Sequence, residues 1–194
     1  MSFSSLQWFQ LVWWTALALY YGHRISIDLD LFSSEYFDEQ AMQIALLKEL
    51  EVHGMSIKIV NIAPHTINAY IDGIKVDILT HHYPIIWENY CENGMTLSSL
   101  ADIWAMKLSA AAGRGSKKDF FDIYELLQHF SFEELLWFYN LKYTQIDSYH
   151  VIRALTYFDD AELQEDPTML TNTTRDDVKW YISDQIASYM EKII

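Results

Sequence analysis

The chain has 194 residues, of which 51% are hydrophobic, with a formal net charge of −14 and one cysteine, Cys91. This length and apolar content suffice for one domain or two small ones, and no apolar run reaches the roughly 18 residues that a membrane span needs. The net charge argues against a protein that coats nucleic acid, because such proteins carry an excess of Lys and Arg. One cysteine excludes an internal disulfide and favours a reducing, cytoplasmic location. Because the chain has no long apolar run, no membrane contact is expected.

The chain opens with an apolar stretch, Leu6–Trp14, which is expected to form a buried strand or the end of a helix. Thr15–Tyr21 is expected to form a short helix, and Gly22 is a natural C-terminal cap for it.

A strand is expected over residues 25–32, where apolar and polar residues alternate. Its polar face carries Ser26, Asp28 and Asp30, which places the two carboxylates about 7 Å apart along the strand. Two carboxylates at this spacing repel each other unless water, a proton or a cation lies between them. A hard cation such as Mg²⁺ prefers oxygen ligands, although a polar strand face that simply meets solvent explains the same pattern.

A helix is expected next, from an N-cap at Ser33-Ser34 to about Leu50. Three short strands are expected after it, over residues 56–62, 66–71 and 74–79. The pair Asp72-Gly73 between the last two strands predicts a two-residue hairpin turn. In the last strand, Lys75 and Asp77 share the face opposite to the apolar residues.

Beyond about Tyr90 the pattern is helical. Helices are expected over residues 97–111, 116–130, 131–139, 148–158 and 174–193, with a loop over 159–173. The sequence thus predicts an α+β chain. A small mixed sheet with helices occupies residues 1–90, and a helical domain over residues 91–194 packs on this core and completes the site.

The basic residues are concentrated at one place, since Lys107, Arg114, Lys117 and Lys118 fall within twelve positions. A cationic patch on an acidic chain suits a single anionic ligand such as a nucleotide. A solvated helix end has the same composition.

Several of these candidate residues also have positions that suit a purely structural role. Ser116 and Asp119 have the spacing of a capping box, and Lys118 with Asp122 has that of an i, i+4 ion pair. For Arg24, the alternative role is only to neutralise the carboxylates of the acidic strand.

Three carboxylates would meet if the strand of Asp28 and Asp30 lay beside the strand of Asp77. Such a set can hold two Mg²⁺ ions, one orienting a triphosphate and one lowering the pKa of an attacking hydroxyl. Phosphoryl transfer depends mainly on positioning and charge neutralisation, so these acids and a nearby cation would suffice. A surface position for Asp77 on an edge strand is equally consistent with the pattern.

Three motifs resemble those of the AbiEii/AbiGii toxin-like nucleotidyltransferase family, over residues 14–33, 72–79 and 107–124. They correspond in order to the opening motif with its acidic strand, the third-carboxylate strand, and a Lys…Arg-Gly-x-x-Lys-Asp-x-x-Asp helix. The resemblance implies a polymerase-β-type nucleotidyltransferase fold and metal-dependent transfer of NMP from an NTP to an acceptor hydroxyl. It also implies the toxin half of an abortive-infection toxin–antitoxin pair, acting in phage defence with an antitoxin from the same operon.

The resemblance further implies roles for individual residues. Asp28, Asp30 and Asp77 would bind two Mg²⁺ ions and act in catalysis, with Asp77 as the base for the incoming hydroxyl. Lys118 would be catalytic by stabilising charge on the phosphates. The nucleotide-binding residues would be Thr15, Arg24, Ser26, Lys107, Arg114, Asp119 and Asp122. Family members of this kind modify RNA, typically tRNA, so an RNA acceptor is expected.

One departure from the family pattern lies directly before Thr15, where Trp13-Trp14 replaces Gly-Gly. Glycines at these positions let backbone N–H groups approach the triphosphate, and two indoles would crowd that approach. Two other functions therefore stay open. One is a catalytically impaired nucleotidyltransferase scaffold that works as a binding module, and the other is a small-molecule nucleotidyltransferase whose acidic surface attracts a cationic substrate.

Overall fold

The computed structural model describes residues 3–92 and 94–193. Contacts divide the chain into two compact units, residues 1–16 with 26–99 and residues 17–25 with 100–194. The segment 17–25 therefore belongs with the second unit, while a domain boundary between residues 90 and 91 stays a prediction. No helix within the described ranges is long and apolar enough to cross a membrane.

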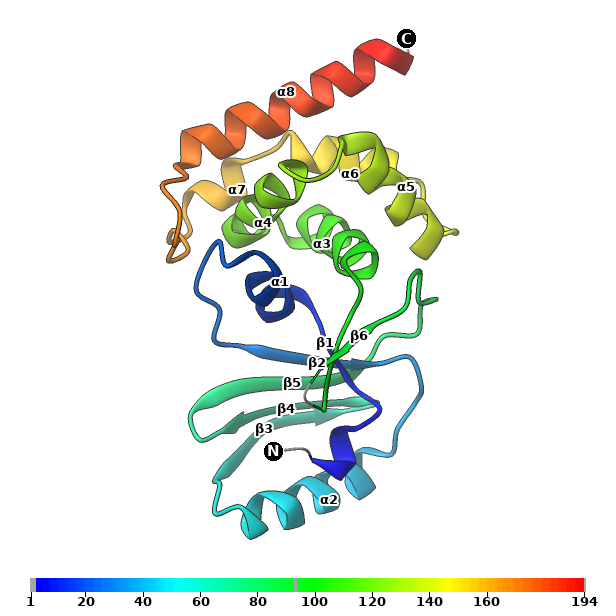
Figure 1. Cartoon of the computed structure of the whole chain (residues 1–194), viewed down its shortest axis with the longest axis vertical. Coiled ribbons are helices and arrows are strands. Elements are labelled where there is room, and N and C mark those ends of the chain that lie inside the picture. Colours follow the sequence, from blue (N-terminus) through cyan, green and yellow to red (C-terminus); the bar gives the residue numbers. More distant parts are fainter. Residues whose placement is uncertain (1–2, 93, 194) are drawn as a thin grey trace. The chain divides into compact units, whose positions relative to one another are not determined.

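The first unit is built on a mixed sheet (Figure 1). Its strands are β1 (Gln10–Leu11), β2 (Leu29–Ser33), β3 (Ile57–Ala63), β4 (Thr66–Ile71), β5 (Ile74–Thr80), β6 (Tyr90–Glu92) and β7 (Met95–Leu97). In the described part of the chain they form one seven-stranded sheet of order β3-β4-β5-β2-β1-β7-β6. The pairs β2–β5 and β1–β7 are parallel, and the other neighbours are antiparallel. The predicted mixed sheet is confirmed.

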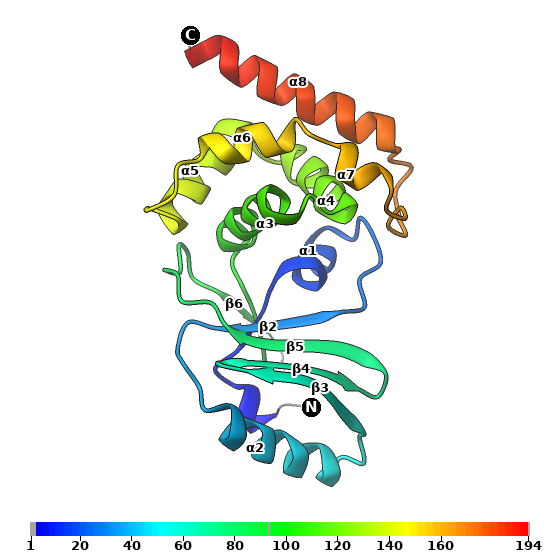
Figure 2. The same cartoon turned by 180° about the vertical axis from the view of Figure 1, so that it is seen from behind.

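One face of this sheet packs on helix α2 (Glu39–Val52) and on the short 3-10 helix η1 (Ser4–Leu6), as Figures 1 and 2 show. The buried core on this face consists of Phe9, Leu46, Ile67, Val76 and Ile78. Each fully buried side chain of this size contributes about 1.5–3 kcal/mol. Since side chains alternate along a strand, the residues between the core positions point to the opposite face of the sheet.

The turn between β4 and β5 has the predicted hairpin geometry. Asp72 and Gly73 both have positive φ, 47° and 83°, as a type I′ turn requires. The Asp72 carboxylate also accepts hydrogen bonds from the backbone N–H and the hydroxyl of Ser56, both at 2.8 Å. This turn fixes the register that places Asp77 on β5.

The acidic strand is shorter than predicted, because β2 begins only at Leu29. Ile25 donates its backbone N–H to the carbonyl of Thr168 at 2.9 Å, and Arg24 forms an isolated antiparallel bridge with Met169. Residues 24–25 therefore pair within the second unit, and Ile25 is exposed instead of buried. Local alternation could not reveal a partner more than 140 residues away in the sequence.

Helix α2 begins later than predicted, at Glu39, with Asp38 as its N-cap. The Asp38 carboxylate accepts a hydrogen bond from the backbone N–H of Ala41 at 2.7 Å. Ser33 belongs to β2, and its hydroxyl accepts a hydrogen bond from the backbone N–H of Glu35. The prediction of an N-cap at Ser33-Ser34 is wrong because β2 extends through Ser33.

The second unit is helical (Figure 2). Helix α1 (Trp13–Tyr21) leads into it, and its other helices are α3 (Leu100–Arg114), α4 (Lys117–Leu127), α5 (Phe132–Lys142), α6 (Tyr149–Leu155), α7 (Asp159–Glu162) and α8 (Arg175–Ile193). Helix α3 packs against α4, α5 and α6, and α8 also packs against these three helices. The central position of α3 buries Asp102 and Lys107, and Asp102 is paired with Lys142 at 2.7 Å.

Two elements differ from the predicted helical half. The hairpin of β6 and β7 precedes α3, so this helix begins at Leu100 and not at Leu97. The short helix α7 lies inside the predicted loop 159–173. Strands of three residues and a helix of four are too short to show a clear hydrophobic period.

Candidate active site

The acidic face of the first unit brings two predicted residues together across neighbouring strands. Asp30 on β2 and Asp77 on β5 are register partners in a parallel pair, so both side chains lie on the same face of the sheet. Asp30 is buried, and the Asp77 side chain is 16% exposed. Asp28 precedes β2 by one residue and is half-buried. The predicted adjacency of the two acidic strands is confirmed.

Two hydroxyl groups stand beside the start of this acidic strand. The Thr15 hydroxyl on α1 lies 3.0 Å from the hydroxyl of Ser26 and donates a hydrogen bond to the backbone carbonyl of Asp28. These contacts join the first turn of α1 to the segment that leads into β2. The structure therefore places Thr15, Ser26 and Asp28 together within the first unit.

Trp13, which stands where the family pattern has glycine, has a backbone conformation that glycine adopts more readily than other residues. Its φ is 54°, in the left-handed region, which costs a residue with a side chain about 1–2 kcal/mol. Its ring packs edge-on against Phe32, with ring centroids 4.9 Å apart, and also against Trp14 at 6.0 Å. Aromatic pairs of this kind contribute about 0.5–1.5 kcal/mol each, so packing of the indole offsets the backbone strain.

Asp122 on α4 is the centre of a buried ion-pair network in the second unit. Arg24 donates two hydrogen bonds to its carboxylate, at 2.7 and 3.0 Å, and Lys107 donates one at 2.7 Å. His23 Nε2 lies 2.7 Å from the same carboxylate. Burial alone would raise the pKa of Asp122, but the Lys107 charge and the hydrogen bonds from His23 and Arg24 hold it far below its usual value.

Asp119 extends this network by one turn of α4. Its buried carboxylate accepts a hydrogen bond from Arg114 Nε at 3.0 Å and lies 4.0 Å from Lys107 Nζ. Burial lowers the pKa of Lys107 to about 8 although Asp122 and Asp119 oppose the shift. Burial likewise raises the pKa of Asp119, against the charges of Lys107 and Arg114. The side chain of Ser116 makes no capping hydrogen bond, so the capping-box interpretation is wrong.

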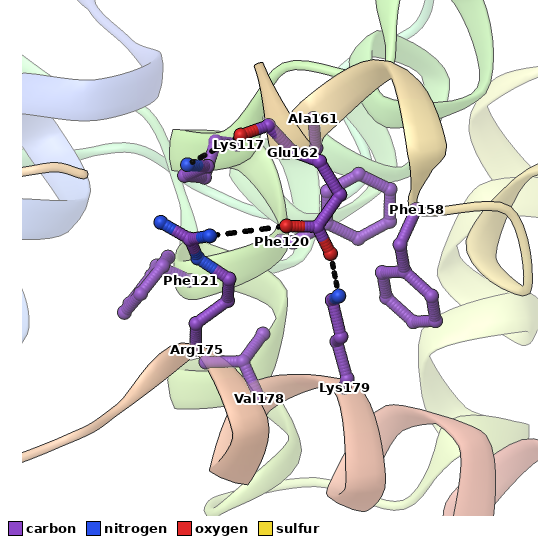
Figure 3. A pocket seen from close by; sticks show the side chains of 9 residues that line it. All are labelled: Lys117, Phe120, Phe121, Phe158, Ala161, Glu162, Arg175, Val178 and Lys179. Carbon is purple, nitrogen blue, oxygen red and sulfur yellow. Dashed lines mark hydrogen bonds and ion pairs between the residues drawn. The ribbon is translucent and has the colours of Figure 1, made fainter. Parts of the chain in front are cut away.

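The two adjacent lysines of this motif have different environments. Lys117 is buried, and its ammonium donates to the backbone carbonyls of Glu162 and Gln164 and pairs with Asp166 at 3.1 Å. Figure 3 shows Lys117 beside Glu162, which in turn pairs with Arg175 from α8. The adjoining cavity of about 20 Å³ has room for about one water. Lys117 therefore ties α4 to the segment that precedes α8.

Lys118 is half-buried at the next position of α4. Its catalytic role stays a prediction, as do the nucleotide-binding roles of Arg24, Lys107 and Arg114.

The sequence matches a family of known enzymes over most of its length. Residues 15–191 match the sequence model described as "Nucleotidyl transferase AbiEii toxin, Type IV TA system". The chain belongs to the AbiEii nucleotidyltransferase toxin family. This AbiEii-family chain is therefore a nucleotidyltransferase of a type IV toxin–antitoxin system, which brings with it an NTP substrate and an antitoxin partner.

Individual proteins are similar to this chain in sequence or in fold. The AbiEii-family chain is 34% identical over 167 residues to the uncharacterized protein aq_aa25 of Aquifex aeolicus, covering 81% of this chain and 78% of that protein. Its fold is similar to JHP933 from Helicobacter pylori, with TM-score 0.59 and 18% identity over 98% of this chain and 88% of that one. It is also similar to MenT4, a nucleotidyltransferase toxin from Mycobacterium tuberculosis H37Rv, with TM-score 0.59 and 13% identity over 92% and 74%. The predicted nucleotidyltransferase fold is confirmed.

The oxygen donors of the candidate site are of the kind that a hard divalent cation prefers, and the strand register places two of them on the same face of the sheet. Asp30 and Asp77 offer carboxylate oxygens from one face, with Asp28 beside them. The Asp77 oxygens, however, accept hydrogen bonds from Asn68 and Lys75. Across residues 3–92 and 94–193, no three or more His, Cys, Asp or Glu side chains stand close enough to hold a metal ion. For these carboxylates to bind one metal ion together, the Asp77 side chain or its hydrogen-bond partners must therefore move.

Three residues of this AbiEii-family site were not among the predicted ones. His23 reaches Asp122 from 99 positions away, and no local pattern in the sequence indicates that contact. Lys75 and Asn68 bind Asp77 directly. The alternation of β5 already places Lys75 on the Asp77 face, so its contact with Asp77 could be predicted from the sequence. The contact of Asn68 with Asp77 could not, because it depends on the register of the hairpin.

Proposed function

We propose that this toxin transfers an NMP from an NTP to a hydroxyl group of an RNA, with tRNA as the expected acceptor, in a reaction that depends on Mg²⁺. The observation that carries the proposal is the alignment of Asp30 with Asp77 on one face of the sheet, with Asp28 next to them. The phage-defence setting and the cytoplasmic location rest on the resemblance and on the single cysteine.

The reaction requires one bond to form and one to break. The acceptor oxygen attacks the α-phosphorus, the new P–O bond forms, and the bond to the β-phosphate oxygen breaks to release pyrophosphate. Asp77 takes the proton of the acceptor hydroxyl. Asp28, Asp30 and Asp77 would hold the divalent cations, which would neutralise phosphate charge and lower the pKa of the hydroxyl.

The remaining predicted residues bind the nucleotide in this proposal. The hydroxyls of Thr15 and Ser26, which already meet beside Asp28, donate to the phosphates. Lys118 and Arg114 supply positive charge that stabilises the transition state. Lys107 also supplies charge, and its partner Asp122 holds it in place.

Two further predicted residues act through others. Arg24 fixes Asp122 with its two hydrogen bonds, and Asp119 orients Arg114.

Transfer of label from α-³²P-labelled NTPs to total RNA and to purified tRNA tests this function. The wild-type protein should label RNA in the presence of Mg²⁺, and Asp28→Asn and Asp30→Asn should each lose at least about 100-fold in rate. Asp184→Asn, which removes an exposed carboxylate from α8, should keep the wild-type rate. Equal labelling by all four proteins would refute the proposal.

The same assay separates the two other functions. Label in a small cationic compound instead of RNA would identify a small-molecule nucleotidyltransferase. An impaired scaffold would give neither label nor heat of binding when Mg²⁺-NTP is titrated in a calorimeter.

A further inference from the structure

Asp77 is the third predicted carboxylate, and both of its oxygens have partners. Lys75 Nζ lies 2.5 Å from Oδ2, and Asn68 Nδ2 lies 2.8 Å from Oδ1. Asn68 in turn accepts a hydrogen bond from Asn61 at 3.2 Å. These residues come from the adjacent strands β3, β4 and β5 (Figure 1) and are register partners across them, except for Lys75, which precedes Asp77 by two positions. They form a continuous polar row that ends at the acidic face.

Lys75 lies on the acidic face of the sheet. Positions 75 and 77 of β5 share a face, and Asp77 is the register partner of Asp30 on β2. The Lys75 side chain is 43% exposed, and a lysine has a flexible four-carbon stem, so the ammonium can move into solvent without unfolding the strand.

We propose that Lys75 is the internal counter-cation of the acidic face and competes with a divalent cation for Oδ2 of Asp77. This inference rests on the proposed function, since it concerns the same three carboxylates. An ammonium at 2.5 Å occupies the oxygen that a shared metal ion would need, and two cations at that distance repel each other. Metal binding therefore displaces Lys75 from Asp77, while the hydrogen bond from Asn68 keeps the carboxylate on the face.

The competition predicts two opposite effects when the Lys75 charge is removed. Without metal, the three carboxylates lose their counter-charge and repel each other, so the protein should unfold at a lower temperature in low salt. With metal, the competitor is gone, so the affinity for a divalent cation should rise. A residue with only a structural role on the strand would lower stability without raising that affinity.

The test is calorimetric titration with Mn²⁺ alone, combined with melting of the metal-free protein at low ionic strength. Lys75→Gln keeps a hydrogen-bond donor and removes the charge, and it should bind Mn²⁺ about tenfold more tightly than wild type and melt at a lower temperature. Lys75→Arg keeps the charge and should resemble wild type in both measurements. Lys58→Gln is the matched control, because Lys58 is an exposed lysine of the neighbouring strand β3.

The outcomes separate this inference from the function that it rests on. If wild type binds Mn²⁺ through Asp28 and Asp30 but Lys75→Gln binds no more tightly than wild type or Lys58→Gln, the role of Lys75 is refuted and the proposed function stands. If no variant binds Mn²⁺ and none labels RNA, both are refuted. Should Lys75→Gln not fold, Lys75→Met gives the same comparison with the polar group absent.

Discussion

Trp13 combines a departure from the family pattern with a backbone conformation that is unusual for a residue with a side chain. Its positive φ of 54° is the conformation that glycine adopts at little cost. Trp13→Gly and Trp13→Ala both remove the ring packing with Phe32, but only alanine retains the left-handed strain. The glycine variant should therefore be about 1–2 kcal/mol more stable than the alanine variant in urea unfolding. Equal stabilities would mean that the positive φ is not imposed by the fold.

The free energy of unfolding of the second unit depends strongly on one carboxylate, that of Asp122. Asp122→Asn leaves Arg24 and Lys107 buried without their charge partner, which should cost about 3–5 kcal/mol at neutral pH. The pKa of Asp122 is lowered in the folded state, so its contribution is complete above the unfolded-state pKa and is lost as pH falls below about 4. The difference in unfolding free energy between wild type and this variant should shrink in acid.

Urea unfolding of both proteins from neutral to acid pH measures this difference. Asp184→Asn should stay within about 0.5 kcal/mol of wild type at neutral pH. A constant difference between wild type and Asp122→Asn down to the acid limit would contradict the assigned pKa direction.

The β4–β5 hairpin illustrates the dependence of an element on its turn. Gly73 has a φ of 83°, and a Cβ there would meet no atom within 4 Å, so only backbone strain opposes a side chain. Gly73→Ala should therefore lose about 1–2 kcal/mol of stability. Gly113→Ala, in helix α3 with open space around the added Cβ, should instead gain about 0.5–1 kcal/mol. Thermal melting compares the two, and a stabilising Gly73→Ala would exclude the type I′ turn.

The elements that the sequence could predict are those specified by nearby residues. The Asp72-Gly73 pair and the alternation on either side predict β4 and β5 nearly to the residue. The late start of the acidic strand follows from the contacts of residues 24–25 with residues 168–169. The late start of α2 follows from the extension of β2 through Ser33. Such boundaries are decided by tertiary contacts, which a local pattern does not contain.

At the scale of the whole molecule, the candidate residues fall in both units, with the aligned carboxylates in the first and the Asp122 network in the second. The aligned carboxylates could be predicted because strand periodicity orients Asp30 and Asp77, although only the sheet topology shows that β2 and β5 are neighbours. The contact of His23 and Arg24 with Asp122 joins residues about 100 positions apart. Composition and spacing do not indicate this contact. The resemblance to the family pointed to Asp122 and Arg24 as site residues but did not indicate that they pair with each other.

The toxin assignment predicts an effect on cells that follows the same carboxylates. Induced expression of the wild-type chain in a bacterial host should arrest growth, because nucleotidyl transfer removes functional acceptors. Asp30→Asn should permit growth at equal protein level, and Asp184→Asn should arrest it as wild type does. Growth arrest by Asp30→Asn would separate toxicity from the acidic face.

Anomalous diffraction at the manganese edge, from crystals grown with Mn²⁺ and a non-hydrolysable NTP, tests the acidic face most directly. Manganese peaks are expected at the carboxylates of Asp28, Asp30 and Asp77, with Lys75 displaced from Asp77 and the triphosphate on the same ions. Nucleotide bound with manganese at other residues, or with Lys75 still paired to Asp77 beside an empty acidic face, would contradict this expectation.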